Sequence, residues 1–276
     1  MEIIDGKALA AEMRQELKEK IEKMARKPGL AVVIVGQDPA STIYVRNKIK
    51  ACEDLGIRSY SYELPEHSTQ EQVETLLKEL GQDNNVDGIL LQLPLPKHLN
   101  ENSAVACIPV EKDVDGFSSE NLGLLLQDKA KIVACTPLGV MKMLEKYGID
   151  PTGKHAVVVG RSETVGKPMA LLLLNANATV TICHSKTKNI KEICKQADIL
   201  VAAVGRANFI TADMIKDGAV VIDVGINRNQ NGKLCGDVDF ENVKEKTSYI
   251  TPVPGGVGPM TITMLMYNTY IAAIKE

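Results

Sequence analysis

A lysine lies on the apolar face of an expected helix. When residues 39–55 are laid out at about 100° per residue, Lys48 falls in the middle of an apolar stripe. The stripe comprises Tyr44, Val45, Ala51, Cys52 and Leu55. A lysine on a buried face is costly to ionise, so Lys48 could exchange protons near neutral pH as a general acid or base. Tyr44 could hydrogen-bond it or stack on a flat substrate. Alternatively, Lys48 could reach water from the edge of the stripe.

Two further segments supply polar groups that could act with this lysine. Gln92 directly follows the expected strand 88–91, and its amide can both donate and accept at a carboxyl strand end, where α/β folds bind ligands. Asp113 and Asp115 belong to an Asp-Val-Asp-Gly-Phe stretch that is typical of a turn. A plain strand end and a plain Asx-turn remain the alternatives. Because an EF-hand loop needs further ligands and a terminal glutamate, we predict no metal site.

A glycine-rich turn after the expected strand 155–159 is the clearest nucleotide signal. The turn contains Gly160, Arg161, Ser162, Val165 and Gly166. Its spacing is G-x-S-x-x-x-G rather than G-x-G-x-x-G. Backbone N–H groups at the start of the following helix would suit a phosphate. A tight turn without a ligand is the alternative.

The charges that follow the next strand favour NADP over NAD. An NAD site usually places an acidic residue there to hold the ribose 2′-OH, whereas this chain has His184, Ser185 and Lys186. With Arg161 close by and no carboxylate to repel a 2′-phosphate, the local charge suits NADP. Either cation could instead be a solvated surface charge.

Two further turns follow strands at the edge of the sheet where ligands bind. They contain Gly205, Gly225 and Ile226. Both could be mere turns.

The elements that must position these groups alternate between β-branched runs and helical patterns, which is typical of βαβ units and parallel sheets. The first series has expected strands 31–35, 59–63 and 88–91 with helices 39–55 and 69–80. The second has expected strands 155–159, 179–183, 199–204 and 220–224 with a helix at 166–175. We therefore predict an α/β fold of two α/β domains, of which the second is Rossmann-like.

Residues that begin or interrupt helices indicate how these domains are joined. Asp38 suits the N-cap of helix 39–55. Thr136 as N-cap and Pro137 at the first position predict a helix that ends at Tyr147-Gly148 and bridges the domains. Residues 251–259 are too rich in glycine and proline for regular structure, and they precede an apolar helix, 260–274, that could return to the first domain.

Composition excludes several classes of protein. The chain has 276 residues, of which 45% are hydrophobic and 24% charged, as in an ordinary globular protein. A net charge of -3 is unlike that of a protein whose main partner is nucleic acid. With no visible export signal or span-length apolar run, we expect a soluble cytoplasmic protein without a membrane partner. The six cysteines show no C-x-x-C pair, so we expect free thiols.

Five motifs occur in the order found in one enzyme family. They are Tyr44-Val45-Arg46-Asn47-Lys48, Leu91-Gln92-Leu93-Pro94-Leu95-Pro96, Asp113-Val114-Asp115-Gly116-Phe117, the turn from Val159 to Pro168, and Pro252-Val253-Pro254-Gly255-Gly256-Val257-Gly258-Pro259-Met260-Thr261. The chain thus resembles the bifunctional methylenetetrahydrofolate dehydrogenase/cyclohydrolase family over nearly its whole length. One stretch, 205–209, reads differently from the Gly-Lys-Pro that is commoner in that family.

The resemblance implies a function and a set of site residues. It implies oxidation of 5,10-methylene-tetrahydrofolate with NADP, followed by hydrolysis of the methenyl product to 10-formyl-tetrahydrofolate. Lys48 would be the general acid/base, Gln92 its assistant, Tyr44 a stacking or orienting group and Asp115 the pterin ligand. The implied folate contacts are Tyr44, Lys48, Gln92, Leu93, Asp115, Pro254, Gly255 and Gly256. The implied cofactor contacts are Gly160, Arg161, Ser162, Val165, Gly166, His184, Ser185, Gly205, Gly225 and Ile226.

The resemblance also implies a domain plan and an assembly. Residues 1–135, together with a C-terminal helix at 260–276, would form the folate-binding catalytic domain. Residues 136–259 would form the NADP-binding domain, with the active site in the cleft and two subunits in a homodimer. Three alternatives stay open: a monofunctional dehydrogenase, a non-catalytic NADP-binding scaffold, and an unrelated NADP-dependent oxidoreductase of the shikimate type.

Overall fold

The computed structural model describes residues 1–36, 39–229 and 232–274, with the backbone alone for residues 39–43. The expected N-cap Asp38 therefore lies outside the described residues. The chain forms two compact units. The three-strand unit consists of residues 12–135 and 262–276, and the six-strand unit consists of residues 1–11 and 136–261. Within the described ranges, no helix has both the length and the apolar character needed to span a membrane.

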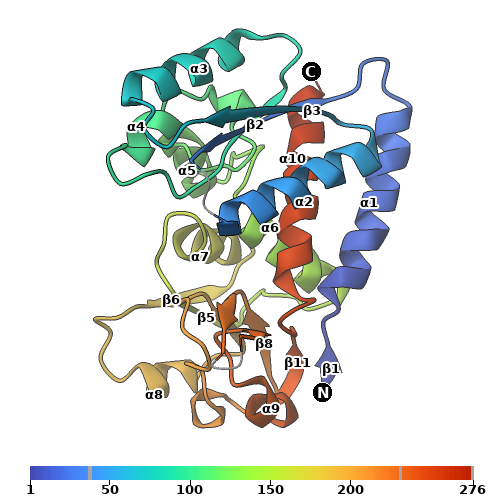
Figure 1. Ribbon diagram of the computed structural model, residues 1–276. Coiled ribbons are helices and arrows are strands. Elements are labelled where there is room, and N and C mark those ends of the chain that lie inside the picture. The colour runs from blue at the N-terminus through green and yellow to red at the C-terminus, as the bar shows by residue number, and fades with distance from the viewer. Residues whose placement is uncertain (37–38, 230–231, 275–276) are drawn as a thin grey trace. The chain divides into compact units, whose positions relative to one another are not determined.

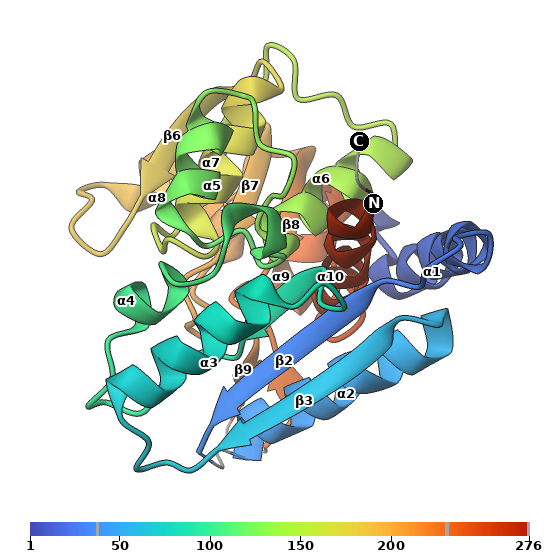
Figure 2. The ribbon, with the colours of Figure 1, turned by 90° about the horizontal axis from the view of Figure 1, so that it is seen from above.

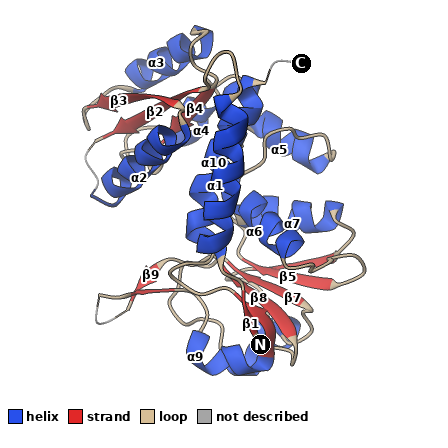
Figure 3. Ribbon diagram, turned by 90° about the vertical axis from the view of Figure 1, so that its right-hand side faces the viewer, coloured by secondary structure: helices blue, strands red, loops and turns tan. Residues whose placement is uncertain are grey.

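Parallel strands in the order β3-β2-β4 make up the sheet of the three-strand unit (Figure 3). Their bounds are β2 Gly29–Val35, β3 Arg58–Leu64 and β4 Gly88–Leu91. Every residue of β2 and β4 is buried, as expected for strands covered on both faces. Gln92 directly follows β4 and still donates its backbone N–H to the Val33 oxygen, at 2.8 Å. The sheet thereby places the Gln92 side chain at its carboxyl edge.

Helices cover both faces of this sheet. Helix α3 (Gln70–Gln82) lies on one face and α2 (Pro39–Leu55) on the other (Figures 2 and 3). Thr69 caps α3 in a capping box with Gln72, and the buried face of α3 packs on alternate residues of β2 and β4. The remaining helical segments of this unit are α4 Glu101–Val105, the 3₁₀ turn Val110–Lys112 and α5 Ser119–Leu126.

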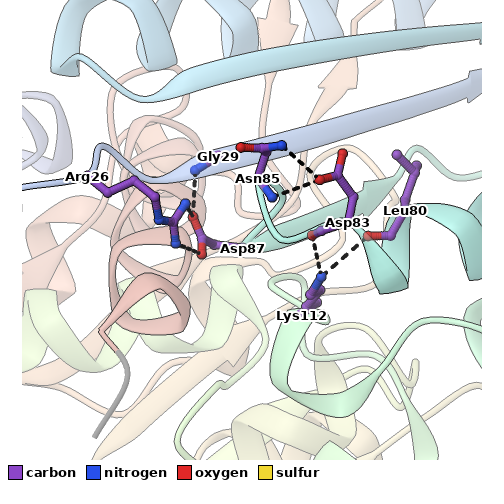
Figure 4. A network of polar contacts seen from close by, with 7 residues as sticks. All are labelled: Arg26, Gly29, Leu80, Asp83, Asn85, Asp87 and Lys112. Atoms are coloured by element: carbon purple, nitrogen blue, oxygen red, sulfur yellow. Dashed lines mark hydrogen bonds and ion pairs between the residues drawn. The ribbon is translucent and has the colours of Figure 1, made fainter.

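A polar network closes the amino edge of the same sheet (Figure 4). The carboxylate of Asp87, which is 5% exposed, accepts from both terminal nitrogens of Arg26 and from the N–H of Gly29 at 2.8 Å. Lys112 Nζ donates to the backbone oxygen of Asp83 at 2.8 Å. A buried carboxylate with these partners is fully satisfied, so this network stabilises the amino edge of the sheet.

The sheet of the six-strand unit is parallel throughout, in the order β1-β11-β8-β7-β5-β6. Its strands are β1 Glu2–Ile3, β5 His155–Val159, β6 Thr179–Cys183, β7 Ile199–Ala202, β8 Ala219–Asp223 and β11 Thr247–Ile250. Figure 3 shows several of these strands in red. A separate antiparallel pair joins β9 (Asn227–Arg228) to β10 (Leu234–Cys235).

Pairing of β1 with β11 changes one expected boundary. We expected residues 1–135 in a single domain, but residues 1–11 belong to the six-strand unit because Glu2 and Ile3 pair with Tyr249 and Ile250. Helix α1 (Gly6–Glu22) then continues the chain into the three-strand unit. Residues 262–276 join the three-strand unit, so α10 (Val257–Ala273, red in Figure 1) contributes residues to both units.

Two helices begin earlier than expected. Helix α6 (Cys135–Lys146) already includes Thr136, so Thr136 is not an N-cap; its Oγ1 lies 2.9 Å from Oγ1 of Thr261 instead. Helix α10 starts at Val257 although we expected irregular structure up to residue 259. Pro259 is accommodated there because the first turn of a helix has no intrahelical use for its N–H. The other helices of the six-strand unit are α7 Gly166–Asn175, α8 Ile190–Cys194 and α9 Phe240–Val243.

Candidate active site

Lys48 and Gln92 are brought together in the three-strand unit. Lys48 is half-buried on α2, and its Nζ donates to Gln92 Oε1 at 3.0 Å. The other half of the amide, Gln92 Nε2, donates to the backbone oxygen of Leu93 at 2.6 Å. Both ends of the Gln92 amide are thus engaged, which fixes the oxygen toward Lys48. A glutamine held in this way restricts the lysine nitrogen to one position.

The apolar stripe around Lys48 is present but does not extend to Tyr44. Val45, Ala51 and Cys52 are all 6% exposed or less, whereas Tyr44 is 41% exposed. The buried stripe therefore begins at Val45, and Tyr44, which we expected in it, is exposed. Tyr44 and Lys48 are four residues apart on one helix face, so the exposed phenol ring is available to a ligand on the same side as the lysine.

Asp115 lies in a turn that a buried neighbour builds. Asp113, 1% exposed, accepts from the N–H groups of Gly116, Phe117 and Ser118 at 3.1, 3.3 and 2.8 Å. It also accepts from the side chain of Asn121 at 2.9 Å. Asp113 therefore forms an Asx-turn, which the sequence left open as an alternative for this stretch. The turn holds the backbone on both sides of Asp115 and so fixes the position of that residue.

The surroundings of Asp115 favour its neutral form more than water does. Burial raises the pKa of Asp115 from 3.8 to about 6; the positive charge of Lys48 opposes this rise, and the charge of Asp113 adds to it. The thiol of Cys135 lies 3.8 Å from Asp115 Oδ1. Asp113 pairs in parallel with Ile89 of β4, so Asp115 lies toward the carboxyl side of that strand, where Gln92 follows. The contact of Lys48 with Gln92 and the effect of its charge on the pKa of Asp115 place the lysine in the same region, and the three predicted residues form one cluster.

Asn268 supports this cluster and was missed by sequence reasoning. It is completely buried on α10, and its Nδ2 donates to the backbone oxygens of Val114 at 2.9 Å and Val133 at 2.8 Å. These bonds tie the residue before Asp115 to a helix 154 residues further along the chain. The available signal was the one amide side chain in a helix that has no charged residue, since a buried amide needs partners.

The other predicted folate contacts are divided between the units. Leu93 follows Gln92 in the three-strand unit, whereas Pro254, Gly255 and Gly256 belong to the six-strand unit. In that unit, a Cβ on Gly256 would lie 2.5 Å from the Pro252 oxygen, and the φ of Gly255 is +105°. Both glycines are therefore required by the backbone of this turn.

The glycine turn after β5 is built as tightly as its sequence suggests. A Cβ on Gly160 would lie 2.3 Å from the Ala203 oxygen, and one on Gly166 would lie 2.4 Å from the Gly160 oxygen. The N–H groups at the start of α7 differ from expectation, however. Ser162 Oγ accepts from Val165 and Gly166 at 3.2 and 3.3 Å, so these amides are capped locally rather than open to a phosphate.

Polar groups without a carboxylate follow β6, as the sequence indicates. Ser185 and Lys186 are exposed, and His184 is half-buried with its Nδ1 accepting from the N–H of Lys186 at 3.1 Å. Arg161, after β5, is also exposed. Because β5 and β6 are neighbours in the sheet, these groups lie at adjacent strand ends. The arrangement suits a phosphate group carried on a ribose.

The loops after β7 and β8 contain the remaining predicted cofactor residues and are held by two buried aspartates. Asp237 accepts from the N–H groups of Val204, Gly205 and Arg206 at 2.6, 3.0 and 2.8 Å. Strand β7 ends at Ala202, before the expected residue 204, because these amides turn toward Asp237.

The second aspartate, Asp223, stabilises the loop after β8. It accepts from the N–H groups of Gly225, Asp237 and Val238 at 2.9–3.0 Å. The side chain of Ile226, in the same loop, is 50% exposed and thus available to a ligand. In the sequence, Asp223 is recognisable only as the first residue of a stretch that follows a strand, and Asp237 carries no signal of this role.

Two family models match the chain in succession. Residues 4–115 match the catalytic domain of tetrahydrofolate dehydrogenase/cyclohydrolase, and residues 134–276 match the NAD(P)-binding domain of the same enzymes.

Whole-chain relatives agree with the family models. The bifunctional protein FolD of Campylobacter concisus is 56% identical over 276 residues, covering 99% of this chain and 98% of the relative. The crystal structure of the bifunctional enzyme FolD from Campylobacter jejuni is 50% identical with a TM-score of 0.97, covering 99% of this chain and 98% of that one. A Trypanosoma brucei FolD structure, described as complexed with NADP cofactor and inhibitor, is 40% identical with a TM-score of 0.92, covering 98% and 96%. The chain therefore belongs to the tetrahydrofolate dehydrogenase/cyclohydrolase family.

Proposed function

We propose that this chain catalyses the NADP-dependent oxidation of 5,10-methylene-tetrahydrofolate and the hydrolysis of the resulting methenyl group to 10-formyl-tetrahydrofolate. The observation that carries the proposal is the cluster of Lys48, Gln92 and Asp115 at the carboxyl side of β4. A scaffold that only binds nucleotide would not need a lysine, an amide and a carboxylate in this arrangement. The family of bifunctional enzymes to which the chain belongs supports both activities.

Asp115 is the residue we assign to the pterin ring. An ionised carboxylate accepts two parallel hydrogen bonds from an amino group and a ring N–H, which would fix the ring for hydride transfer. Tyr44, exposed one turn before Lys48, offers its ring for stacking. Leu93 and the turn Pro254–Gly256 are the remaining proposed folate contacts.

Lys48 is the residue we assign to the hydrolytic step. The methenyl product is cationic, and its charge would disfavour the ammonium form of a lysine nearby. The neutral amine can accept a proton from the water that adds to the methenyl carbon. The same group, now protonated, returns a proton to a ring nitrogen as the bridge opens. Gln92 would hold Nζ in place through the 3.0 Å contact during both transfers.

NADP, when bound, would supply the hydride acceptor, and the six-strand unit fits such a cofactor. A Cβ at Gly160 or Gly166 would meet the protein's own backbone, so these two glycines hold the start of α7 tightly against the carboxyl end of β5, the strand edge where dinucleotides bind. Arg161 and Ser185 provide a positive charge and a hydroxyl for a 2′-phosphate. The remaining proposed cofactor contacts are Ser162, Val165, His184, Gly205, Gly225 and Ile226. We propose NADP in preference to NAD on these grounds.

A homodimer is part of the same proposal because the family resemblance implies one. Light scattering coupled to size-exclusion chromatography would measure the mass of the assembly. A mass of one chain at micromolar concentration would contradict the dimer without affecting the proposed chemistry.

The function is tested with Lys48→Met, using Lys50→Met as the matched control. Both lysines lie on α2, but Lys50 is exposed. Absorbance time courses with methylene-tetrahydrofolate and either NADP or NAD would follow reduced nicotinamide and the methenyl product separately. We expect the wild type to form NADPH with little methenyl accumulation, and Lys48→Met to lose hydrolysis while its NADP affinity stays unchanged.

Other outcomes separate the alternatives. Accumulation of the methenyl product by the wild type would indicate a monofunctional dehydrogenase. Absence of reduction with either cofactor would favour a binding protein. If Lys48→Met lost NADP affinity to the same extent as hydrolysis, the separate roles assigned to Lys48 and to the nucleotide-binding residues would be contradicted.

A further inference from the structure

The six-strand unit buries two aspartates side by side, and neither takes part in the mechanism above. Asp223 is 3% exposed and Asp237 is completely buried. The backbone N–H of Asp237 donates to Asp223 Oδ1 at 2.9 Å, which places the two residues in direct contact. Burying two neighbouring carboxylates is unfavourable unless something compensates their charge. Such a pair in a ligand-binding unit therefore calls for a physical reason.

Neutral N–H groups provide the compensation that the structure shows. Asp237 accepts from three successive backbone amides and from Asn227 Nδ2 at 2.9 Å. Asp223 accepts from three backbone amides. In the part of the chain that the structure describes, neither carboxylate is paired with a lysine or arginine side chain. Hydrogen bonds satisfy the oxygen atoms, but the net negative charge remains.

The surrounding backbone is shaped to enclose these carboxylates. A Cβ on Gly225 would lie 2.2 Å from Asp237 Oδ1, and one on Gly236 would lie 1.8 Å from Asp223 Oδ2. Only glycine permits such close approach at these two positions. The loops after β7 and β8 are thus wrapped around the pair, so removing either carboxylate would alter both the loops and their electrostatics.

Sheet order indicates which part of the cofactor these loops would meet. The order β8-β7-β5-β6 changes direction between β5 and β7, and dinucleotides bind across the carboxyl ends of strands at such a switch point. The 2′-phosphate, and hence the adenosine half, is assigned to the loops after β5 and β6. The nicotinamide half then falls on the side of β7 and β8, where Gly205 and Gly225 are located.

Charge distinguishes the two redox forms of the cofactor at that end. The oxidised nicotinamide ring carries a positive charge, whereas the reduced ring is neutral. We propose that Asp223 and Asp237 form a buried anionic pair that fixes the loops after β7 and β8 and selectively stabilises the oxidised cofactor. The inference rests on the proposed function, because it takes NADP as the ligand. It assigns Asp237 and Asp223 as positioning and specificity-determining residues.

The size of the effect follows from electrostatics. Coulomb attraction is long-ranged in a medium of effective dielectric constant about 20, so losing one buried negative charge can change the affinity ratio of the two redox forms about tenfold. Burial raises the pKa of Asp223 to about 6, so measurements at pH 8 keep this carboxyl ionised.

Binding measurements on the full chain test the proposal. Isothermal titration calorimetry at pH 8, without folate, would give the Kd of NADP⁺ and of NADPH for the wild type, Asp237→Asn and Asp223→Asn. We expect both variants to lose about tenfold more affinity for NADP⁺ than for NADPH. Asn227→Ala is the matched control, since it removes one bond to Asp237 and retains both carboxylates. It should change both affinities by the same factor.

The outcomes are separable. If both aspartate variants weaken the two redox forms by equal factors, the pair only supports the loops and the proposal is wrong. Asp223→Asn decides the question if Asp237→Asn does not fold, which thermal unfolding would reveal. If the wild type binds neither NADP⁺ nor NADPH, the proposed cofactor is wrong. If the wild type binds both, but the ratio of the two Kd values is the same in the aspartate variants as in the wild type, only this inference is wrong.

Discussion

Replacing Asp115 by asparagine is expected to stabilise the folded chain while weakening its binding of folate. Burial raises the pKa of this carboxyl from 3.8 to about 6, although Lys48 opposes the rise. The folded protein therefore holds Asp115 as the neutral acid more readily than the unfolded chain does. Asparagine is neutral at every pH and similar in size, so it removes the unfavourable ionisation without creating a cavity.

The magnitude follows from the two pKa values. A carboxyl whose pKa rises from 3.8 to about 6 on folding lowers the free energy of unfolding by about 3 kcal/mol once it is ionised in both states. This loss begins as the pH rises above 3.8 and is complete above about 6. We expect Asp115→Asn to raise the free energy of unfolding by about 1–3 kcal/mol at pH 7.5 and by little at pH 4.

Urea unfolding followed by circular dichroism at both pH values would measure the stability difference. The same two proteins would then be titrated with a folate analogue by calorimetry at pH 7.5. Because hydrogen bonds to a charged acceptor contribute about 1.5–3 kcal/mol, Asp115→Asn should bind the analogue about 10- to 150-fold more weakly. The uncharged amide in Asp115→Asn would thus make the folded chain more stable and its binding of folate weaker, because both effects come from the loss of one negative charge.

Asp113→Asn provides a matched comparison two residues away. The Asp113 carboxylate accepts from three backbone amides and from Asn121, so its replacement should lower the free energy of unfolding by about 1–3 kcal/mol at pH 7.5. The reasoning on Asp115 would be refuted if Asp115→Asn proved no more stable than the wild type at pH 7.5, or if its stability gain were the same at pH 4.

Three shorter predictions concern both units. Gln92→Leu removes the acceptor of the 3.0 Å bond from Lys48, so the rate of methenyl hydrolysis should fall about 10-fold or more with an unchanged Kd for NADP, as stopped-flow and calorimetry would show. Gly166→Ala should lower the melting temperature and weaken NADP binding, because its Cβ would lie 2.4 Å from a backbone oxygen, whereas Gly123→Ala in α5 has open space and should be neutral or stabilising. Ser185→Asp places a carboxylate after β6 and should weaken NADP binding at least about tenfold while leaving NAD binding nearly unchanged; equal effects on both would contradict the assignment of the 2′-phosphate.

Local patterns were sufficient to predict most elements. The strands at 88–91, 155–159 and 179–183 and the helix at 166–175 have the predicted bounds. Short β-branched runs between glycine and polar turns determine a buried strand locally, and a glycine-rich turn determines where the next helix begins. The parallel α/β class followed from the alternation of these elements.

Boundaries set by distant contacts could not be predicted in this way. Thr136 lies within α6 and contacts Thr261 instead of capping the helix. Strand β7 ends at Ala202 because the next amides turn toward Asp237, 33 residues from Val204. Residues 1–11 join the six-strand unit through pairing of β1 with β11. Each of these partners is remote along the chain, so no local pattern records it.

The candidate site divides along the same line. The sequence by itself determined which side chains could do chemistry, since Lys48 on an apolar stripe, Gln92 at a strand end and the glycine turn at 160–166 are local features, and the family motifs contain all of them. Only the tertiary structure decided that Lys48 donates to Gln92, that burial raises the pKa of Asp115, and that Asn268 supports the turn before it. Hydrogen bonding and desolvation depend on which atoms surround a group, and residues far apart in the sequence supply those atoms.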